Sequence, residues 1–455
     1  MGGDRSGILL ESVAGPSEDA RYSIFAIDPV RTLRVENPSE GDPISRLAAL
    51  CRPWRGLTPR LRPDHDPPLV GGWIGYLGYE TGRFVEPTAG WDDRRSPLPI
   101  AHWSLFDTVL IHDARADSWA VAGVDLPREW TPERRPSLAD RFDLWETLVS
   151  RSVESPPTHE RNDIGWERGT WNISRSDYLE MVDCAIGYIR AGDIFQVNLA
   201  RRFRLRTHET PIAIYRRLCE SNPAAYAAYL PSPSNDGQRC TNAVISSSPE
   251  LFLRLEEGIV TSQPIKGTRP RGTTPDEDAL AIAALANSNK DRAELTMIVD
   301  LVRNDLGRVC TYGTVQVSNE GAIEQHPTVF HRAATVRGRL RADCDAFDLL
   351  RAAFPGGSVT GAPKVRAMQL IHTFETEARG PYCGAIGYIG LDGNMALNLP
   401  IRTLTMADGW LDLKVGSGIV ADSVPEEEYE ELGAKAAGML AAIGAGETRT
   451  VPALT

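Results

Sequence analysis

The sequence has few of the features that mark secreted, zinc-binding or membrane proteins. Its seven cysteines stand singly, without the CxxC pairs of zinc sites or the dense pattern of disulfide-linked domains. The N-terminus, MGGDRSGILLESVAG, contains acidic residues and only a three-residue apolar run, so it predicts neither a secretory signal nor a membrane anchor. We therefore expect reduced thiols and a cytoplasmic protein.

Motifs of several common active sites are also missing. There is no GxSxG elbow, no HExxH zinc pair and no GxCxG nucleophile of the kind found in glutaminases. Gly416 and Gly418 form a GSG fragment, which does not predict a dinucleotide site without a third glycine and a downstream acid. The eight histidines show no local metal pattern, and a single one such as His331 is more often structural.

Positive charge is in deficit. Lysine and arginine total 49 against 61 aspartates and glutamates, a formal net charge of -12, which makes a general nucleic-acid-binding surface improbable. A small anionic substrate is still compatible with this charge, because it needs only a local cluster of cations or a metal ion. The 455 residues, with 42% apolar and 24% charged side chains, indicate a globular protein with a large core.

Residues 1–151 contain short strand-like runs between Gly, Pro and Asp: GILLESV, YSIFAI, GGWIGYLGYE, LFDTVLIHD and SWAVAGV. Residues 152–170 show no hydrophobic period and predict a connection. Residues 171–445 mix strands with helices, the first capped by Ser174 or Ser176. Because strands and helices do not alternate regularly, we expect an α+β fold built on large antiparallel sheets with flanking helices.

Two acidic pairs lie on segments expected to be helical. Asp291 and Glu294 are three residues apart, as are Glu428 and Glu431 in a helix that begins near Pro425 after a cap at Asp422 or Ser423. A spacing of three places both acids of a pair on one helix face. If the two faces meet, four carboxylates surround one point and suit Mg²⁺; the alternative is two solvated helix faces.

Two further segments carry candidate chemistry. In PIKGTRPRG, neighbouring cations would favour the neutral, nucleophilic amine of Lys266, although a basic turn is commonly just a solvated loop. In FPGGSVTGAPKVRAM, small residues including Ser358, Thr360 and Gly361 precede a helix at Pro363, so their backbone N–H groups are available to an anion. This loop lacks the Gly-Lys-Ser/Thr order of a P-loop.

Taken in order, several motifs closely resemble the chorismate-utilising enzymes, the group of anthranilate, aminodeoxychorismate, isochorismate and salicylate synthases. The resemblance implies one fold of antiparallel sheets like that of anthranilate synthase component I, with the active site in a cleft. The opening segments LLESV, IFAIDP and GGWIGYLGYE resemble the anthranilate and aminodeoxychorismate subgroup. The motifs are SSSPELFL, PIKGTRPRG, DRAELTMIVDLVRNDLGRV, FPGGSVTGAPKVRAMQLI, CGAIGYIG, PIRTLT and GSGIVADSVPEEEYEE.

The same resemblance assigns roles to residues. It implies that Glu294 and Glu431 bind Mg²⁺ directly and that Asp291 and Glu428 hold the metal's waters. The metal would bridge the ring carboxylate of chorismate, which Lys435 would approach. His331 would be an active-site histidine. A tryptophan pocket would involve Leu10, Glu11 and Ser12. The enolpyruvyl group would be held by Arg402, Tyr388, Ser358 and the amides of Gly416 and Gly418.

Two positions distinguish reactions within the family. Isochorismate and salicylate synthases carry a water-activating lysine where this chain has Gln196, which implies ammonia as the nucleophile. Anthranilate synthases usually have alanine where this chain has Lys266, whereas many aminodeoxychorismate synthases have lysine. The implied mechanism has Lys266 attack ring carbon 2 of chorismate while Glu250 protonates the departing 4-hydroxyl group.

A partner is also implied. Because the chain has no glutaminase cysteine, ammonia should come from a separate glutamine amidotransferase subunit in a heterodimer. The resulting expectation is an aminodeoxychorismate synthase subunit of p-aminobenzoate and folate synthesis. Anthranilate synthase component I is the alternative. A catalytically inactive, tryptophan-binding regulatory protein is a third hypothesis, which the retained acids and Lys266 argue against.

Overall fold

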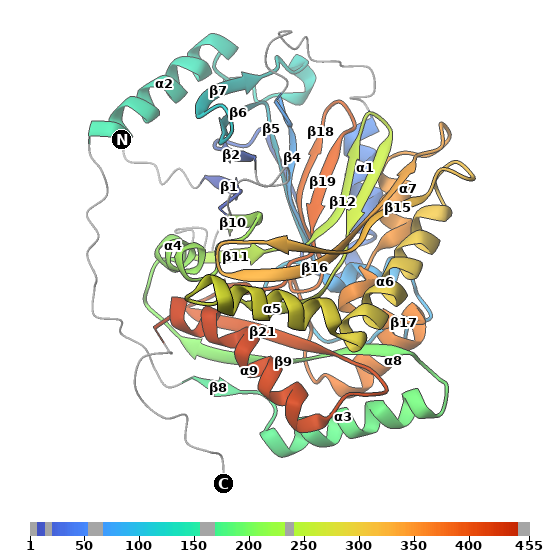
Figure 1. Cartoon of the computed structure of the whole chain (residues 1–455). Helices are drawn as coiled ribbons and strands as arrows, with labels where there is room; N and C mark the ends of the chain where they lie inside the picture. Colours follow the sequence, from blue (N-terminus) through green and yellow to red (C-terminus); the bar gives the residue numbers. More distant parts are fainter. Residues whose placement is uncertain (1–6, 14–20, 53–66, 155–168, 233–240, 445–455) are drawn as a thin grey trace.

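A computed structural model describes residues 7–13, 21–52, 67–154, 169–232 and 241–444. Two large antiparallel sheets form its centre, and helices cover their outer sides (Figure 1). The helices are α1 (Pro43–Cys51), α2 (Leu138–Glu154), α3 (Arg175–Arg190), α4 (Pro211–Ser221), α5 (Pro275–Asn287), α6 (Asn289–Gly307), α7 (Ala346–Ala353), α8 (Lys364–Phe374) and α9 (Pro425–Ala442), with short 3-10 turns η1 (Pro38–Glu40), η3 (Tyr79–Phe84), η4 (Arg128–Trp130) and η5 (Gly357–Val359).

The first sheet has eleven strands and the second has ten. Across the first they are β17 (Gly361–Ala362), β9 (Gln196–Arg206), β21 (Trp410–Ile419), β20 (Thr403–Ala407), β11 (Asn242–Ser248), β10 (Tyr226–Ser232), β1 (Ile8–Glu11), β2 (Tyr22–Ala26), β6 (Thr108–Asp113) and β7 (Ser118–Gly123), with β8 (Thr170–Trp171) beside β9. Across the second they are β14 (Ile265–Pro270), β16 (Val329–Arg339), β13 (Ile259–Gln263), β12 (Leu251–Glu256), β19 (Met395–Asn398), β18 (Ala385–Gly390), β4 (Gly72–Leu77), β5 (Ala101–Phe106) and β3 (Arg31–Val35), with β15 (Gln316–Gln325) beside β16.

Strands from both sides of the connection at 152–170 share both sheets. In the first sheet β1 pairs with β10, and in the second β4 pairs with β18. Residues 155–168 of the connection lie outside the described residues. The main apolar core joins helices α3, α4, α6, α7, α8 and α9 to the sheets, and a second cluster lies where β1, β2 and β6 face β4 and β18. In the described part of the chain, no helix is long and apolar enough to cross a bilayer.

Two local predictions need correction. LFDTVLIHD is not one strand: β5 ends at Phe106, β6 begins at Thr108, and the two belong to different sheets. Buried Asp107 forms the corner between them and pairs with Arg135 at 2.6 Å. The cap of α9 is also different, because Val424 is the N-cap residue and makes no side-chain cap. The Ser174 cap of α3 is confirmed.

Candidate active site

The best-defined cluster of polar groups joins β14, η5 and the turn between β11 and β12. Lys266 on β14 donates a hydrogen bond of 3.3 Å from Nζ to the backbone oxygen of Ser358. The Ser358 hydroxyl in turn donates to Oε1 of Glu250 at 2.7 Å. An amine and a carboxyl group are therefore linked through one serine, the arrangement needed for a nucleophile and a proton donor acting on the same molecule.

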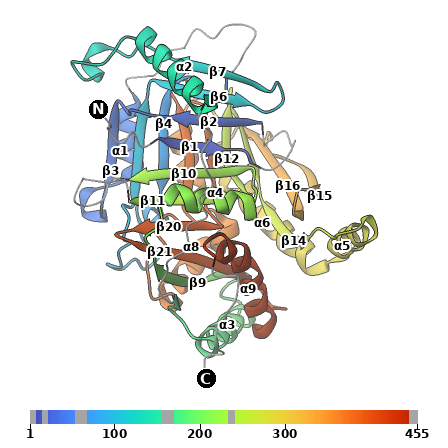
Figure 2. The ribbon, with the colours of Figure 1, turned by 90° about the vertical axis from the view of Figure 1, so that its left-hand side faces the viewer.

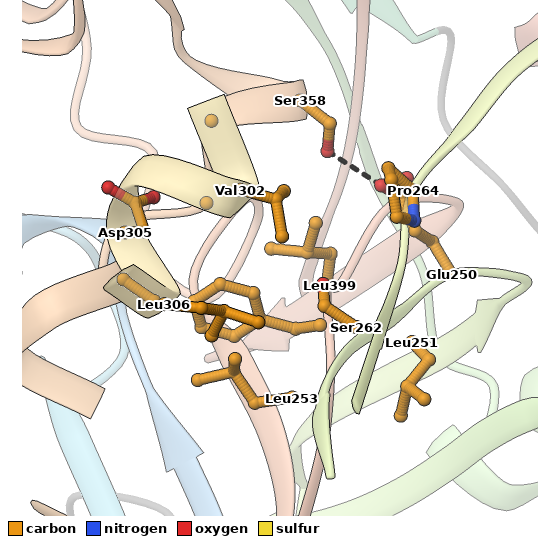
Figure 3. Close-up of a pocket in the computed structure, with 14 residues that line it drawn as sticks. Glu250, Leu251, Leu253, Ser262, Pro264, Val302, Asp305, Leu306, Ser358 and Leu399 are labelled. Atoms are coloured by element: carbon orange, nitrogen blue, oxygen red, sulfur yellow. Dashed lines mark hydrogen bonds between the residues drawn. The ribbon is translucent and has the colours of Figure 1, made fainter. Parts of the chain in front are cut away.

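Glu250 is buried, with 4% of its surface exposed, beside a small cavity of about 20 Å³. Figure 3 shows the Ser358–Glu250 hydrogen bond at one side of this cavity and mostly apolar side chains around the rest, together with Asp305 and Ser262. Burial raises the pKa of Glu250 to about 7, against the opposing effects of the Ser358 hydrogen bond and the Lys266 charge. A substantial fraction of Glu250 is thus protonated near neutral pH. The apolar wall includes Leu251, Leu253, Val302, Leu306 and Leu399.

One ion pair joins the two acidic helices. Helix α6 carries Asp291 and Glu294, and α9 carries Glu428 and Glu431. Lys290, also on α6, donates a hydrogen bond of 2.8 Å to Oε1 of Glu428. α9 lies along β21 and contacts α3, as both views show (Figures 1 and 2).

Each of the four carboxylates contacts a cation of the same chain. Glu428, only 1% exposed, also accepts hydrogen bonds from the hydroxyls of Ser417 and Ser423. Burial of Lys290 disfavours its charged form, but the surrounding carboxylates have the larger effect together and raise the pKa of Lys290. Burial raises the pKa of Glu294 in spite of the nearby lysines. The ion pairs are Lys290–Glu428 at 2.8 Å, Lys266–Glu294 at 3.9 Å, Lys435–Glu431 at 2.6 Å and Arg269–Asp291 at 3.1 Å.

The donor chemistry of these helices fits a hard divalent cation, because all four side chains are carboxylates and carboxylate oxygens are the protein ligands that Mg²⁺ prefers. Within the described ranges, no three acids, histidines or cysteines are arranged to hold an ion. Metal binding would therefore require some of these carboxylates to exchange a lysine or arginine partner for the ion.

Gly416 and Gly418 leave part of β21 without side chains, and we call these two residues the glycine floor. Gly416 and Gly418 face β9, where Asn198 is directly opposite Gly418. A methyl group on Gly418 would lie 3.1 Å from Nε2 of Gln196 and 3.4 Å from Nζ of Lys266. The two glycines therefore leave space next to the Lys266 cluster, and Lys435 donates to the oxygen of Gly416 at 3.3 Å.

The loop predicted to bind an anion is stabilised by an internal hydrogen bond, and its backbone lies close to β9. The hydroxyl of Thr360 donates to the oxygen of Gly356 at 2.8 Å, so it stabilises the loop itself. Gly361 has a φ angle of 135°, and a Cβ atom there would lie 2.2 Å from the oxygen of Gln196. Only glycine permits this close approach of the loop to β9. The expected helix follows as α8, after the short strand β17.

His331 lies near the cluster but is a satisfied, buried residue. Its Nδ1 and the hydroxyl of Thr268 are 2.8 Å apart. Burial, with help from the charge of Arg402, lowers its pKa well below the usual value, so its ring is neutral at physiological pH. Arg402 itself follows β19 with a positive φ of 51°.

Tyr388 is not brought to this cluster. It packs in the second apolar cluster, with Ile24, Ile74 and Tyr76 among its members. Tyr382, six positions earlier, is the tyrosine at the glycine floor: its hydroxyl would lie 2.8 Å from a Cβ on Gly416. Sequence reasoning missed Tyr382 because it precedes β18, whereas Tyr388 stands inside the recognisable strand motif.

The predicted N-terminal pocket residues lie on or next to β1. Glu11 accepts a hydrogen bond of 2.8 Å from the hydroxyl of Tyr215, and Ser12 donates to the oxygen of Ala225 at 3.0 Å. Leu10 pairs with Ala228 of β10. These three residues therefore connect β1 to neighbouring elements. They are far from Lys266 in the sequence, and β1 belongs to the first sheet whereas Lys266 lies on β14 of the second.

Comparison with known proteins gives this arrangement its context. Residues 8–441 match the family model described as chorismate binding enzyme. Anthranilate synthase component 1 of Acetivibrio thermocellus is 40% identical over 97% of this chain and 91% of its own length. Aminodeoxychorismate synthase component 1 of Klebsiella aerogenes is 38% identical over 93% of this chain and 90% of its own.

Solved structures agree on the fold. The crystal structure of anthranilate synthase component I from Streptococcus pneumoniae TIGR4 is similar with a TM-score of 0.77 and 31% sequence identity, covering 93% of each chain. The expected α+β fold like that of anthranilate synthase component I is confirmed.

Proposed function

The chain belongs to the chorismate-binding enzymes, and we propose that within this family it is the synthase subunit of aminodeoxychorismate synthase. In this proposal it converts chorismate and ammonia to 4-amino-4-deoxychorismate. The observation that carries the proposal is the Lys266–Ser358–Glu250 chain of hydrogen bonds, which sets an amine beside a carboxyl group whose pKa is raised to about 7.

Lys266 is the proposed nucleophile. Its amine forms a bond to ring carbon 2 of chorismate, the two ring double bonds shift, and the bond from carbon 4 to its hydroxyl oxygen breaks. Glu250 supplies the proton, so the oxygen departs as water. Ammonia then bonds to carbon 4, the double bonds shift back and the bond to Lys266 breaks, which regenerates the amine. Glu250, now ionised, can take up the proton that the new amine releases.

Burial of Glu250 supports this role. A proton donor acts best when its pKa lies near the working pH, and a fully solvated carboxyl group would be ionised at pH 7. The amine of Lys266 can attack only in its neutral form. Its Nζ faces a backbone oxygen and lies 3.9 Å from Glu294.

Mg²⁺ is the proposed cofactor. Glu294 and Glu431 would hold it, with Asp291 and Glu428 contacting its waters. When bound, the ion would supply positive charge to the ring carboxylate of chorismate. Lys435 would approach the same carboxylate. The glycine floor, Arg402 and Ser358 would hold the enolpyruvyl group, and His331 would lie beside them as a neutral group.

A glutamine amidotransferase subunit is the proposed source of ammonia. Two observations support this proposal: the sequence offers no glutaminase nucleophile, and the chain covers 90% of the Klebsiella aerogenes protein named component 1. The proposed working form is a heterodimer.

Anthranilate synthase component I is the second candidate. The relative in Acetivibrio thermocellus and the Streptococcus pneumoniae structure carry that name, at identities of 40% and 31%. The two products differ chemically, since anthranilate forms with loss of pyruvate whereas aminodeoxychorismate keeps its enolpyruvyl group. Product analysis therefore separates the candidates without reference to sequence.

The test incubates the purified chain with chorismate, Mg²⁺ and an ammonium salt, followed by chromatography and mass spectrometry. We expect aminodeoxychorismate. Without ammonia, a covalent adduct should appear on the peptide that contains Lys266, and the peptides with the other four lysines serve as internal controls. Anthranilate as the product would refute the proposal.

Two substitutions distinguish the role of Lys266 as a nucleophile from the effect of its positive charge. Lys266→Ala removes both, whereas Lys266→Arg keeps a cation near Glu250 and Glu294 but has no nucleophilic amine at neutral pH. Both variants should lose most aminodeoxychorismate formation. Any product that remains in Lys266→Ala at high ammonium should shift toward the carbon-2 amine or anthranilate. Full activity of Lys266→Arg would show that only the charge matters and would exclude the covalent mechanism.

A further inference from the structure

Arg379 is a buried arginine whose side chain joins three separate segments of the chain. It lies between α8 and β18, and only 2% of its surface is exposed. Its Nε donates to Oε2 of Glu375 at 2.9 Å, and Nη2 donates to Oε1 of the same carboxylate at 2.5 Å. Two further bonds go to backbone oxygens, from Nη1 to Val359 at 2.9 Å and from Nη2 to Asn198 at 2.8 Å. One guanidinium group therefore bonds the C-cap of α8, the turn η5 and the strand β9.

The surroundings of the guanidinium restrict it to one orientation. The Glu375 carboxylate, which Arg379 contacts through two N–H groups, also accepts the backbone N–H of Ala200 at 3.0 Å. The guanidinium carbon lies 4.7 Å from the centre of the Tyr79 ring and 6.0 Å from that of Tyr382. Because the guanidinium is planar and its donors have fixed directions, holding two of them also directs the others.

The backbone around Arg379 is held by two side chains from distant parts of the sequence. Glu80, a buried residue in the segment GGWIGYLGYE, accepts the backbone N–H groups of Arg379 at 2.7 Å and of Gly380 at 3.0 Å. Lys414 of β21 donates to the oxygen of Ala378 and, at 2.8 Å, to that of Arg379. Glu80 and Lys414 therefore fix the backbone from which the Arg379 side chain extends.

The bond from Arg379 to Val359 reaches the proposed active site through one covalent neighbour. Val359 directly follows Ser358, whose hydroxyl donates to Glu250 at 2.7 Å. A hydrogen bond weakens steeply as its length and angle depart from the optimum, so a shift of η5 would weaken the bond to Glu250. Arg379 is not among the groups that shift the pKa of Glu250 directly, whereas Ser358 is.

We propose that Arg379 is a positioning residue for the reaction, and that its guanidinium fixes η5 against β9 so that the Ser358 hydroxyl reaches Glu250. This inference rests on the proposed role of Glu250 as the proton donor. Arginine suits the task because one rigid group meets a carboxylate and two backbone oxygens at once. Lysine would bring the same charge but only one nitrogen atom.

The test measures the pH profile of kcat and the thermal unfolding of the full chain. Arg379→Lys keeps the charge but loses the planar fork. Arg379→Met combined with Glu375→Gln removes both charges together, so no unpaired charge is left in the core, and this double variant decides the matter if Arg379→Lys does not fold. Arg202→Lys is the matched control, because Arg202 also lies on β9 and pairs with Glu377 at 2.9 Å, an ion pair that does not include η5.

In Arg379→Lys and in the double variant we expect the alkaline limb of the kcat profile to move upward by about one pH unit. The reason is the loss of a hydrogen bond that stabilises the ionised Glu250 carboxylate. Ser358→Ala should give the same shift, and adding Arg379→Lys to it should move the limb no further, because both changes remove one bond. Arg202→Lys should leave the limb in place. A loss of stability alone would lower kcat by the same factor at every pH.

If Ser358→Ala moves the limb but a folded Arg379 variant does not, the inference is overturned and Arg379 is a structural residue only. A further shift when Arg379→Lys is added to Ser358→Ala would also overturn it, because Arg379 would then act on Glu250 without Ser358. An equal shift in Arg202→Lys would do the same.

Failure of the proposed function gives a different result. Product identity and the Lys266 adduct test the reaction itself, for which Arg379 is not needed as evidence. A limb that stays in place in Ser358→Ala would refute Glu250 as the proton donor, and the inference about Arg379 with it. A limb that moves in Ser358→Ala but not in the Arg379 variants refutes only the role of Arg379.

Discussion

Ser358 donates a hydrogen bond of 2.7 Å to Glu250, a residue 108 positions earlier in the chain. Burial raises the pKa of Glu250 to about 7, and this hydrogen bond acts against the increase because it stabilises the ionised carboxylate. Together the two effects determine the pH range in which Glu250 can donate a proton.

Removing the hydroxyl should therefore extend activity to higher pH. In Ser358→Ala the pKa of Glu250 rises further, so the alkaline limb of the kcat profile moves upward. Ser262→Ala, which removes a hydroxyl elsewhere on the wall of the same cavity, is the control and should leave the limb in place. A downward movement in Ser358→Ala would contradict the assignment of Glu250 as the acid.

Glu250→Gln should lower the activity of the enzyme and raise its stability at high pH. We expect kcat to fall by roughly 10²–10⁴-fold, the usual contribution of a general acid. The folded-state pKa is about 7 against an ordinary value of 4.5, so stability present below the lower value is lost as pH rises through 7. Above that pH the glutamine variant should be more stable than the wild type by up to about 3 kcal/mol, as urea unfolding at several pH values would show. Equal stability at high pH would show that Glu250 is not desolvated.

The carboxylates of α6 and α9 should be needed for magnesium. Glu294→Gln and Glu431→Gln are each expected to abolish detectable Mg²⁺ binding in calorimetry and to reduce turnover by at least about 100-fold, because each removes a charged ligand. The fold should persist by circular dichroism. Glu427→Gln, an exposed acid in the first turn of α9, is the matched control. Ordinary magnesium dependence in either variant would remove these residues from the metal site.

Lys290 should compete with magnesium for Glu428, because its ammonium group already pairs with that buried carboxylate at 2.8 Å. Lys290→Met is expected to bind Mg²⁺ several-fold more tightly in calorimetry. Without the ion it should unfold at a lower temperature than the wild type, since a buried charge is left unpaired. Arg292→Met on the same helix controls for the loss of one surface cation. Weaker magnesium binding in Lys290→Met would mean that Lys290 supports the site.

The isolated chain should use ammonium salts but not glutamine. This follows from the absence of a glutaminase nucleophile in its sequence. Turnover should rise with pH at fixed total ammonium, because the reactive species is neutral ammonia. Glutamine-dependent turnover by the purified chain alone would reveal a nucleophile that the sequence analysis did not recognise.

Local patterns in the sequence predicted local structure well. The segments with Asp291 and Glu294, and with Glu428 and Glu431, were expected to be helical and form α6 and α9. Of the two serines expected to cap α3, Ser174 is the N-cap. Asp422 or Ser423 was expected to cap α9, but the Ser423 hydroxyl donates to Glu428 at 2.6 Å and accepts the backbone N–H of Val420, so it caps no N–H of the helix. Local sequence cannot distinguish these two uses of one hydroxyl, because the second requires Glu428 to be buried.

The sequence predicted less well which distant residues lie together in the folded chain. The resemblance to a known family pointed to Lys266, Glu250 and Ser358 as site residues, but no pattern at those positions shows that one hydrogen-bond chain joins them. Tyr388 and Tyr382 are both buried, but Tyr388 lies in the second apolar cluster whereas Tyr382 lies in the main core with its hydroxyl next to Gly416. Asn198 was not singled out in the sequence, since only the folded sheet shows that its Oδ1 accepts no hydrogen bond from the described residues.

Each sheet contains strands from both the N-terminal and the C-terminal parts of the chain. This arrangement affects how the chain folds while it is synthesised on the ribosome. Strand β4 is completed by β18, and Gly387 is translated about 310 residues after its partner Gly75, which corresponds to a delay of roughly 15–60 s at typical elongation rates. During that time one edge of β4 must remain unpaired or be protected by another protein. Chaperone demand, more than intrinsic stability, is therefore expected to limit the yield of this enzyme when it is overproduced.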